Sequence, residues 1–141
     1  MRYLRTMLLA AATSAIALSA AAQELVIGRA NEPQSIDPQF SRTGNNQMTS
    51  LHIFDRLILT DANVRPMPGL AVEWEAEDDT TWLVRLREGV TFHDGSPFTA
   101  ADVVYSLERA PDVPNSPASF AGSVANLASS EIVNDHTIRF T

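Results

Sequence analysis

The sequence predicts an exported protein of the α/β class, and three observations carry the prediction. Trp82, Val84 and Leu86 alternate with their neighbours at the period of a strand that has one buried face. Residues 99–109 combine a capping pattern with apolar side chains at helical spacing. Residues 1–22 have the charge and hydropathy pattern of a secretory leader. We therefore expect a signal peptide followed by a domain that mixes strands with short helices.

Length and composition fit one globular domain or part of a larger one. The chain has 141 residues, of which 45% are hydrophobic and 19% are charged. Its formal net charge is -7 and its basic residues are all arginine, so its surface argues against nucleic acid or an anionic membrane as a partner. The absence of cysteine excludes disulfides, thiolate metal sites and a cysteine nucleophile.

The predicted signal peptide covers residues 1–22. Arg2 and Arg5 form its basic part, residues 7–18 its apolar part, and Ala20-Ala21-Ala22 a cleavage site of small residues. The apolar run is shorter than the roughly 20 residues that a membrane-spanning helix requires, and a lipoprotein leader requires a cysteine at the cut. We therefore expect cleavage near Ala22 and a mature protein that is free in an exported compartment, most simply a bacterial periplasm.

The mature chain is predicted to begin with a strand and two loops. Residues 24–30 form a short apolar run with β-branched side chains, which predicts a buried strand. Two X-Pro pairs, at 32–33 and 37–38, then impose extended or turn geometry. Residues 41–46 form a polar loop that contains glycine and asparagine. Two interpretations of this loop remain open. In one, it only connects to a helix that asparagine caps; in the other, the N–H groups at the helix start bind an anion.

A helix, a strand and an acidic run are predicted next. Residues 47–59 have apolar side chains at helical steps, and a strand is expected at residues 57–60. Trp74 is interpreted as a core residue, because an aromatic beside a strand is usually buried against it. The acidic run at residues 73–79 suggests calcium, but its spacing does not reproduce an EF-hand loop. A solvated turn before a strand at residues 80–86 is therefore the favoured interpretation.

A second strand, a tight turn and a capped helix follow in close succession. Residues 88–89 interrupt the alternation and residues 90–92 resume it. Asp94-Gly95 is a residue pair that suits a tight turn. Thr99 with Asp102 resembles a capping box, which predicts that the helix begins there.

The C-terminal part is predicted to end in a β-hairpin. Residues 111–117 are a proline-rich polar break, and residues 119–130 are weakly helical. Residues 131–141 have strand character on both sides of Asn134-Asp135. We expect two strands joined by a turn at that pair.

Residues 86–109 resemble the signature of a known family. They read LREGVTFHDGSPFTAADVVYSLER, which is similar to the form LR-x-GV-x-FHDG-x-PFTA-x-DV-x-x-S-x-x-R of the family 5 extracellular solute-binding proteins, the dipeptide- and oligopeptide-binding type that feeds ABC importers. The match is long and ungapped, and the run from Leu70 to Trp74 fits a second motif of the family. Phe54 and Asp55 depart from that motif, since the family usually has Tyr and Glu there.

The resemblance implies a fold and a function. The fold is the N-terminal portion of a bilobed periplasmic-binding-protein fold of type II, with a mixed sheet and short helices, and it is expected to be incomplete: residues 23–141 form the N-terminal part of solute-binding lobe I, truncated. The implied function is that of the periplasmic solute-binding component of an ABC importer, most simply for peptides, with no cofactor, no metal and no catalysis. The implied partners are the solute and the ABC permease complex in the inner membrane. The residues implied to contact the solute are Thr43, Gly44, Asn45 and Asn46.

Two alternatives of other classes remain open from the residues alone. His93-Asp94 resembles half of a catalytic dyad, and an exported hydrolase would use Ser96 or Ser106 with it; otherwise His93 orders the turn by hydrogen bonding. The histidines, His52, His93 and His136, lack the spacing of a metal site. A free-standing interaction module is the other alternative.

The implied mechanism also predicts how the chain behaves by itself. A bilobed binder closes because the bound solute contacts both lobes and favours the shut state. We therefore expect this 141-residue chain to bind no solute tightly and to present unpaired sheet edges that associate.

Overall fold

A computed structural model describes residues 25–141, so the predicted signal peptide and the predicted start of the mature chain lie outside the described residues. The chain divides into two units between Ala30 and Asn31, and each is described by itself. In the first unit, residues 25–30 contain no helix or strand. All the elements described below belong to the second unit.

The strand predicted at residues 24–30 is wrong over the residues that the structure describes. Leu25 is 82% exposed and Ile27 is 62% exposed, and the described sheets are built without this segment. The physical reason is that a strand satisfies its backbone N–H and C=O groups only against a neighbouring strand. An apolar, β-branched run shows that a segment can pair, but it does not supply the partner.

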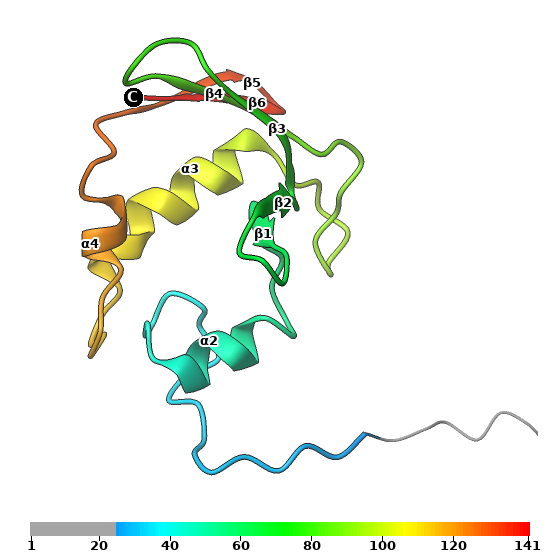
Figure 1. The fold of residues 1–141 in the computed structure, drawn as a ribbon, viewed down its shortest axis with the longest axis vertical. Coiled ribbons are helices and arrows are strands. Elements are labelled where there is room, and N and C mark those ends of the chain that lie inside the picture. Colours follow the sequence, from blue (N-terminus) through cyan, green and yellow to red (C-terminus); the bar gives the residue numbers. More distant parts are fainter. Residues whose placement is uncertain (1–24) are drawn as a thin grey trace, which may run out of the picture. The chain divides into compact units, whose positions relative to one another are not determined.

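A four-stranded antiparallel sheet lies at one end of the second unit, at the top of Figure 1. Its strands, in spatial order, are β3 (Ala71–Ala76), β4 (Trp82–Leu86), β6 (Thr137–Phe140) and β5 (Ser130–Asn134). In the register, Val84 lies opposite both Trp74 and Ile138. The strand predicted at residues 80–86 is therefore confirmed, with its start at Trp82, and so is the C-terminal hairpin.

Helix α3 (Ala100–Arg109) packs against one face of this sheet, as Figure 1 shows. The strand alternation places Val84 and Ile138 on that face, while Arg85 and Arg139 project from the other and pair with glutamates. The core consists of buried apolar residues from both layers: Ala71, Val84, Leu86, Phe98, Ala100, Val103 and Ile138. Burial of these side chains on both sides of one interface is the main term that stabilises the unit.

The predicted start of α3 is confirmed, with Thr99 as the N-cap residue of a capping box. The Asp102 carboxylate accepts hydrogen bonds from the Thr99 backbone N–H, at 2.8 Å, and from its hydroxyl, at 3.0 Å. A carboxylate in the first turn also meets the positive end of the helix dipole. The helix therefore begins where its local sequence specifies.

The second strand predicted at residues 90–92 is wrong, because the segment forms an irregular hairpin loop. It contains a single antiparallel bridge, between Thr91 and Pro97, and Pro97 has no N–H to extend the pairing. The predicted turn is present: Gly95 has φ 87°, a value that glycine adopts without strain.

The helix predicted at residues 47–59 begins earlier and is much shorter, as α2 (Gly44–Ser50). Two side chains at its end bond back to carbonyls in its first turn: the Thr49 hydroxyl donates to the Asn45 carbonyl, and the Ser50 hydroxyl to the Asn46 carbonyl. Such bonds compete with regular continuation of the helix.

Strand pairing takes only the end of the segment that is predicted as helix, and residues 51–57 form a turn and a loop. The expected strand at residues 57–60 appears as β1 (Ile58–Thr60), which pairs with β2 (Pro66–Pro68) in a two-stranded antiparallel sheet. Since this pairing comes from residues farther along the chain, the helical spacing of residues 47–59 did not decide the structure.

The acidic run is only partly the solvated turn that the sequence predicts. Glu73 and Glu75 lie in β3, on the open face, where both pair with Arg85. Trp74, between them, points to the other face and packs against the core, as predicted. The period-2 alternation of a strand thus extends into the acidic run.

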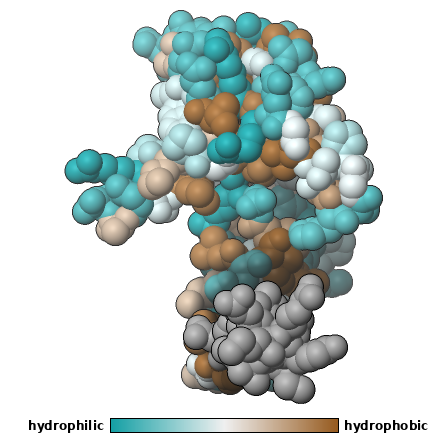
Figure 2. All heavy atoms as spheres, turned by 90° about the vertical axis from the view of Figure 1, so that its right-hand side faces the viewer, coloured by the Kyte–Doolittle hydropathy of each residue, from teal (hydrophilic) through white to brown (hydrophobic). Residues whose placement is uncertain are grey.

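The remaining elements are short. They are η1 (Ala110–Asp112), a 3-10 turn at the end of α3, and α4 (Ala121–Val124). On the surface, hydrophobic side chains lie among hydrophilic ones (Figure 2), and exposed hydrophobic residues include Ile58, Leu59 and Met67. Within residues 25–141, no helix combines the length and the apolar character that crossing a bilayer requires.

Candidate functional site

The predicted contact residues lie together at the start of α2, but in different environments. Thr43 is the N-cap residue, with extended backbone angles, and the other three form the first turn of the helix. Thr43 and Gly44 are exposed, Asn45 is half-buried and Asn46 is buried. The structure therefore divides the candidate residues into those that can reach a bound molecule and one that is enclosed.

The Asn46 side chain holds the preceding loop against α2 by hydrogen bonds. Its side-chain Oδ1 accepts a hydrogen bond from the Gln34 N–H at 2.9 Å, and its Nδ2 donates to the Ser35 carbonyl at 3.1 Å. Asn46 is 1% exposed, and buried amides of this kind are normally fully hydrogen-bonded. Its side chain thus determines where residues 34–35 lie rather than facing solvent.

An ion pair between Arg109 and Asp37 holds the same loop at a second point. Arg109, at the end of α3, donates from Nη1 to Asp37 Oδ1 at 3.2 Å and to Gln39 Oε1 at 2.7 Å, and its Nη2 donates to Asp37 Oδ2. The hydrogen bonds from Arg109 hold the pKa of Asp37 below its ordinary value, while partial burial opposes the shift. Asp37 also accepts from the Gln39 N–H at 2.9 Å, so one carboxylate orders both its own turn and the contact with the helix.

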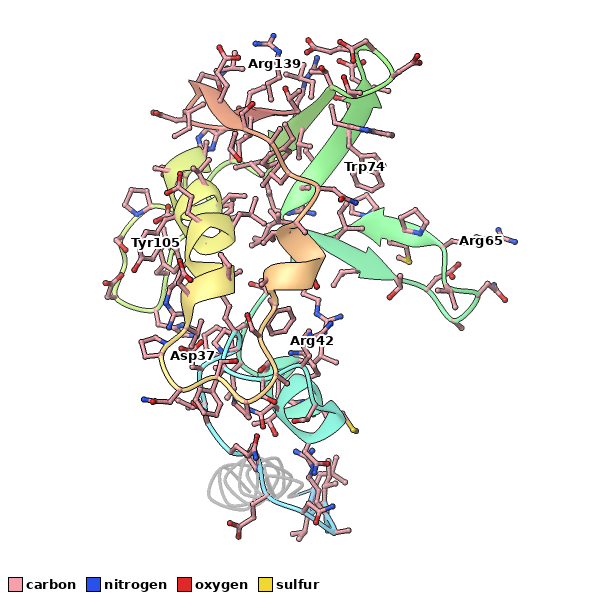
Figure 3. All side chains as sticks on the ribbon, turned by 90° about the vertical axis from the view of Figure 1, so that its left-hand side faces the viewer. Asp37, Arg42, Arg65, Trp74, Tyr105 and Arg139 are labelled. Atoms are coloured by element: carbon pink, nitrogen blue, oxygen red, sulfur yellow. The ribbon has the colours of Figure 1, made fainter. Side chains whose placement is uncertain are left out.

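Residues 116–118 hold the loop from a different segment. The Ser116 hydroxyl donates to the Phe40 carbonyl at 2.7 Å, and the Arg42 N–H donates to the Ala118 carbonyl at 3.1 Å. Between them, Ser41 is fully buried. Figure 3 shows Asp37 near the end of α3 and Arg42 near α2, within the part of the unit where these segments meet.

These contacts of the loop were not predicted from the sequence. Residues Asp37 and Arg109 are 72 positions apart, and no spacing rule connects residues at such a separation. The available signals were indirect: Arg109 closes the matched family motif, and Asp37 precedes a proline in a segment that is predicted to be fixed in shape.

A largely apolar cavity of about 460 Å³ lies beside the loop. The residues that line it come from the loop, from the segment before β1, from the hairpin loop and from α3: Pro38, Gln39, Ile53, Phe54, Asp55, Leu57, Leu70, Val90, Thr91, Phe92, His93, Phe98, Asp102, Val103, Ser106 and Leu107. Phe92 and Phe98 form an edge-to-face pair with ring centroids 6.1 Å apart. Gln39 also donates from Nε2 to the Ser106 carbonyl at 2.6 Å, so loop and helix share this wall.

The hairpin loop has the geometry of an ordered turn. Asp94 accepts hydrogen bonds from the Ser96 N–H at 2.9 Å and from its hydroxyl at 2.7 Å, and these bonds lower the pKa of Asp94. The turn is thus ordered by the hydrogen bonds that Asp94 accepts. The serine proton is directed at Asp94, whereas a hydrolase would require it to be directed at a histidine base.

The same region lacks the ligand set of a metal centre. Within residues 25–141, no three side chains of the His, Asp and Glu types come close enough together to hold a metal ion. What the described site does offer is a polar loop, exposed at Thr43 and Gly44, that is held in shape by residues of several elements. Such a loop on a rigid scaffold is suited to the recognition of a molecule.

A mixed α/β scaffold that presents a fixed polar loop is compatible with a solute-binding protein, and the comparison with known families identifies that class. The chain belongs to the bacterial extracellular solute-binding proteins, family 5: the family model, described as the middle part of that family, matches residues 65–141, more than half of the chain. The family expected from residues 86–109 is thereby confirmed, and its members are solute-binding proteins.

Individual relatives agree with this membership. The chain is 36% identical over 110 residues to the periplasmic oligopeptide-binding protein OppA of Salmonella typhimurium strain LT2, a match that covers 74% of the chain and 20% of the relative. The solved murein tripeptide-binding protein MppA of Escherichia coli matches with a TM-score of 0.70 and 26% identity over 79% of the chain and 25% of that protein. DppA of Helicobacter pylori, solved with the peptide STSA, matches with a TM-score of 0.65 and 26% identity over 78% of the chain and 25% of that protein.

The chain therefore spans about a fifth of the length of the curated relatives that it matches. The predicted fold class is confirmed: the unit is α/β, with short helices and a sheet, and it corresponds to part of a bilobed periplasmic binding protein of type II.

Proposed function

We propose that this chain contributes to the periplasmic solute-binding component of an ABC importer, with peptides as the solute. The observation that carries the proposal is the family match over residues 65–141. Relatives named for oligopeptides and for a murein tripeptide support a peptide as the solute. On this proposal, residues 1–22 are a signal peptide that is removed near Ala22, and residues 23–141 are the N-terminal part of lobe I.

Thr43, Gly44, Asn45 and Asn46 are proposed as the solute-contacting segment, with separate roles. Thr43 is exposed, and its hydroxyl accepts from the Ser41 hydroxyl at 3.2 Å and donates to Asn46 Oδ1 at 3.5 Å, which fixes its orientation. A side chain at Gly44 would have open space around it, so the backbone there is accessible to an extended peptide. Asn46 acts through position, because its amide is used by Gln34 and Ser35. Peptide backbones are recognised by such preordered polar groups at low entropic cost.

Transport follows from closure in this proposal. A peptide that contacts both lobes stabilises the shut form relative to the open one by its differential contacts. The shut form is then presented to the permease complex in the inner membrane. The role of the described unit is to provide one side of that contact on a scaffold whose loop is already ordered.

A chimera tests the proposal. Residues 31–141 would replace the matching segment of Salmonella OppA, and peptide binding would be measured by isothermal titration calorimetry, with circular dichroism to verify folding. The expected result is peptide binding that is lost when residues 43–46 are exchanged for a loop of four alanines, with the parent OppA as control. A folded chimera that binds no member of a broad peptide panel would contradict the proposed solute class.

A further inference from the structure

We propose that Arg109 is a positioning residue that sets the conformation of residues 37–46 by holding Asp37 and Gln39 against the end of α3. The proposal rests on the proposed function only in its last step, where the conformation of the loop determines the affinity for solute. It assigns to the last residue of the family motif a task at a distance from the candidate contact residues.

The geometry of the contact supports orientation as well as attraction. Two nitrogens of one planar guanidinium bond the two oxygens of one carboxylate, and Nη1 also reaches the Gln39 side chain. A bidentate contact of this kind fixes the angle between the two groups, which a single point charge does not. The Arg109 and Asp37 side chains are 34% and 26% exposed, so water screens the pair only in part.

The contact between Arg109 and Asp37 is linked to the candidate site by local hydrogen bonds along residues 37–43. The Phe40 N–H donates to the Asp37 carbonyl at 3.2 Å, and the Thr43 N–H donates to the Ser41 hydroxyl oxygen at 3.3 Å. Asp37 therefore lies at the beginning of a run of local bonds that ends at the N-cap residue of α2. A shift of Asp37 relative to α3 moves the start of that run.

The folding of α3 does not depend on Arg109 in the same way. The helix is held to the sheet by Ala100 and Val103 in the core and begins at the capping box, all at the opposite end from Arg109. Asn46, Ser116 and Ala118 hold the loop independently of the guanidinium. Removal of the Arg109 charge is thus expected to loosen the loop and to leave the helix and the sheet formed.

Hydrogen exchange of the chain tests the positioning role. In Arg109→Gln, amide exchange in residues 34–46 is expected to be about fivefold faster than in the wild type, the upper range for a partly exposed ion pair. Exchange in residues 100–108 and 71–76 should stay within twofold. Arg109→Lys, which keeps the charge but not the fork of donors, should fall between the two. Arg65→Gln is the matched control: it removes the same charge from the exposed β1–β2 turn, where Figure 3 shows Arg65 projecting away from α3.

A spectroscopic readout separates positioning from general support. The charged or titratable groups that act on the pair are Arg109 and Asp37 themselves and Tyr105. The carboxyl carbon of Asp37, followed by NMR, should titrate below the ordinary range in the wild type and in Arg65→Gln, and return towards that range in Arg109→Gln. Unchanged loop exchange in Arg109→Gln, or faster exchange spread equally over the sheet, would overturn the proposal.

The last step is measured in the OppA chimera. Arg109→Gln there is expected to weaken peptide affinity by at most about fivefold, in proportion to the fall in the fraction of molecules whose loop is ordered and competent to bind. If the unsubstituted chimera binds no peptide, the proposed function fails while the exchange experiment still decides the role of Arg109. If the chimera binds peptide with equal affinity in both forms, the positioning proposal fails in its functional step.

Discussion

Asn46 is the residue whose role the structure changes most. From the sequence it is one of four equivalent candidates for solute contact, whereas in the fold its amide joins the Gln34 N–H and the Ser35 carbonyl to α2. Composition and spacing place a polar residue in a polar loop, but they do not reveal that it is 1% exposed. Burial of that side chain depends on a loop that packs back over the helix.

Asn46→Ala is expected to lower the free energy of unfolding by about 1–2 kcal/mol, because it removes two part-buried hydrogen bonds, one from the Gln34 N–H and one to the Ser35 carbonyl. The measurement is urea denaturation followed by circular dichroism. Asn63→Ala, in the exposed turn after β1, is the control and should change stability by less than about 0.5 kcal/mol. An Asn46→Ala chain as stable as the control would show that the loop does not depend on this amide.

Asp37 gives the chain an acid-sensitive contact. Arg109 lowers the pKa of Asp37 in the folded chain below the ordinary value of 3.8, so the ionised carboxylate favours folding. This contribution is complete above the unfolded-state pKa and is lost as the pH falls through the lower, folded-state pKa. The difference in urea midpoint between the wild type and Asp37→Asn should therefore be constant between about pH 5 and pH 7 and shrink below pH 3.8. A difference that grows on acidification would have the wrong sign.

At the scale of elements, local signals specified β4, α3 and the C-terminal hairpin. Strand alternation at Val84 and Leu86, the pair Thr99 and Asp102, and the turn that follows Asn134, one residue later than predicted, each act within a few residues. The strand predicted at residues 24–30 and the length of α2 failed for the opposite reason. Both depend on pairing with, or packing by, segments that the local pattern does not contain.

In the candidate site, too, local features were predicted from the sequence and long-range contacts were not. The position of Thr43 to Asn46 at a helix start was predicted, since a polar loop before an amphipathic run is a local feature. The contacts of Arg109 with Asp37 and of Ser116 with Phe40 join residues 72 and 76 positions apart. Contacts of such separation are set by the packed fold and leave no periodic trace.

The capping box of α3 provides a test at this scale. Asp102→Ala is expected to lower the free energy of unfolding by about 1 kcal/mol, since it removes the acceptor of the Thr99 N–H and a favourable charge at the helix start. Thermal unfolding followed by circular dichroism measures the effect. Glu108→Ala, in the last turn of the same helix, is the control. An equal loss of unfolding free energy in both variants would show that the capping box does not stabilise the helix.

For the whole molecule, the chain spans about a fifth of its curated relatives, and the proposed closure requires contacts from two lobes. We expect the 141-residue chain to bind no peptide tightly by itself. Isothermal titration calorimetry with the peptides that bind the OppA chimera measures this. Micromolar binding by the isolated chain would mean that a single side of the site suffices.

Both outer strands of the four-stranded sheet are edges within the described residues. β3 and β5 each pair with one neighbour in this sheet, and β5 exposes Ile132 and Val133. Unpaired N–H and C=O groups beside exposed apolar side chains favour edge-to-edge association. Size-exclusion chromatography should show an apparent mass that rises with concentration, and Val133→Lys should reduce it. A monomer at all concentrations would contradict this expectation.

The contacts that hold residues 37–42 join residues far apart in the sequence, and this separation affects when the loop can form during synthesis. A ribosome produces the chain from its N-terminus, so Asp37 and Phe40 emerge long before the guanidinium of Arg109 and the hydroxyl of Ser116. The loop of residues 37–42 cannot take its final shape during that interval. Its maturation is therefore a late event, completed only after the residues around 116–118 have joined the growing polypeptide.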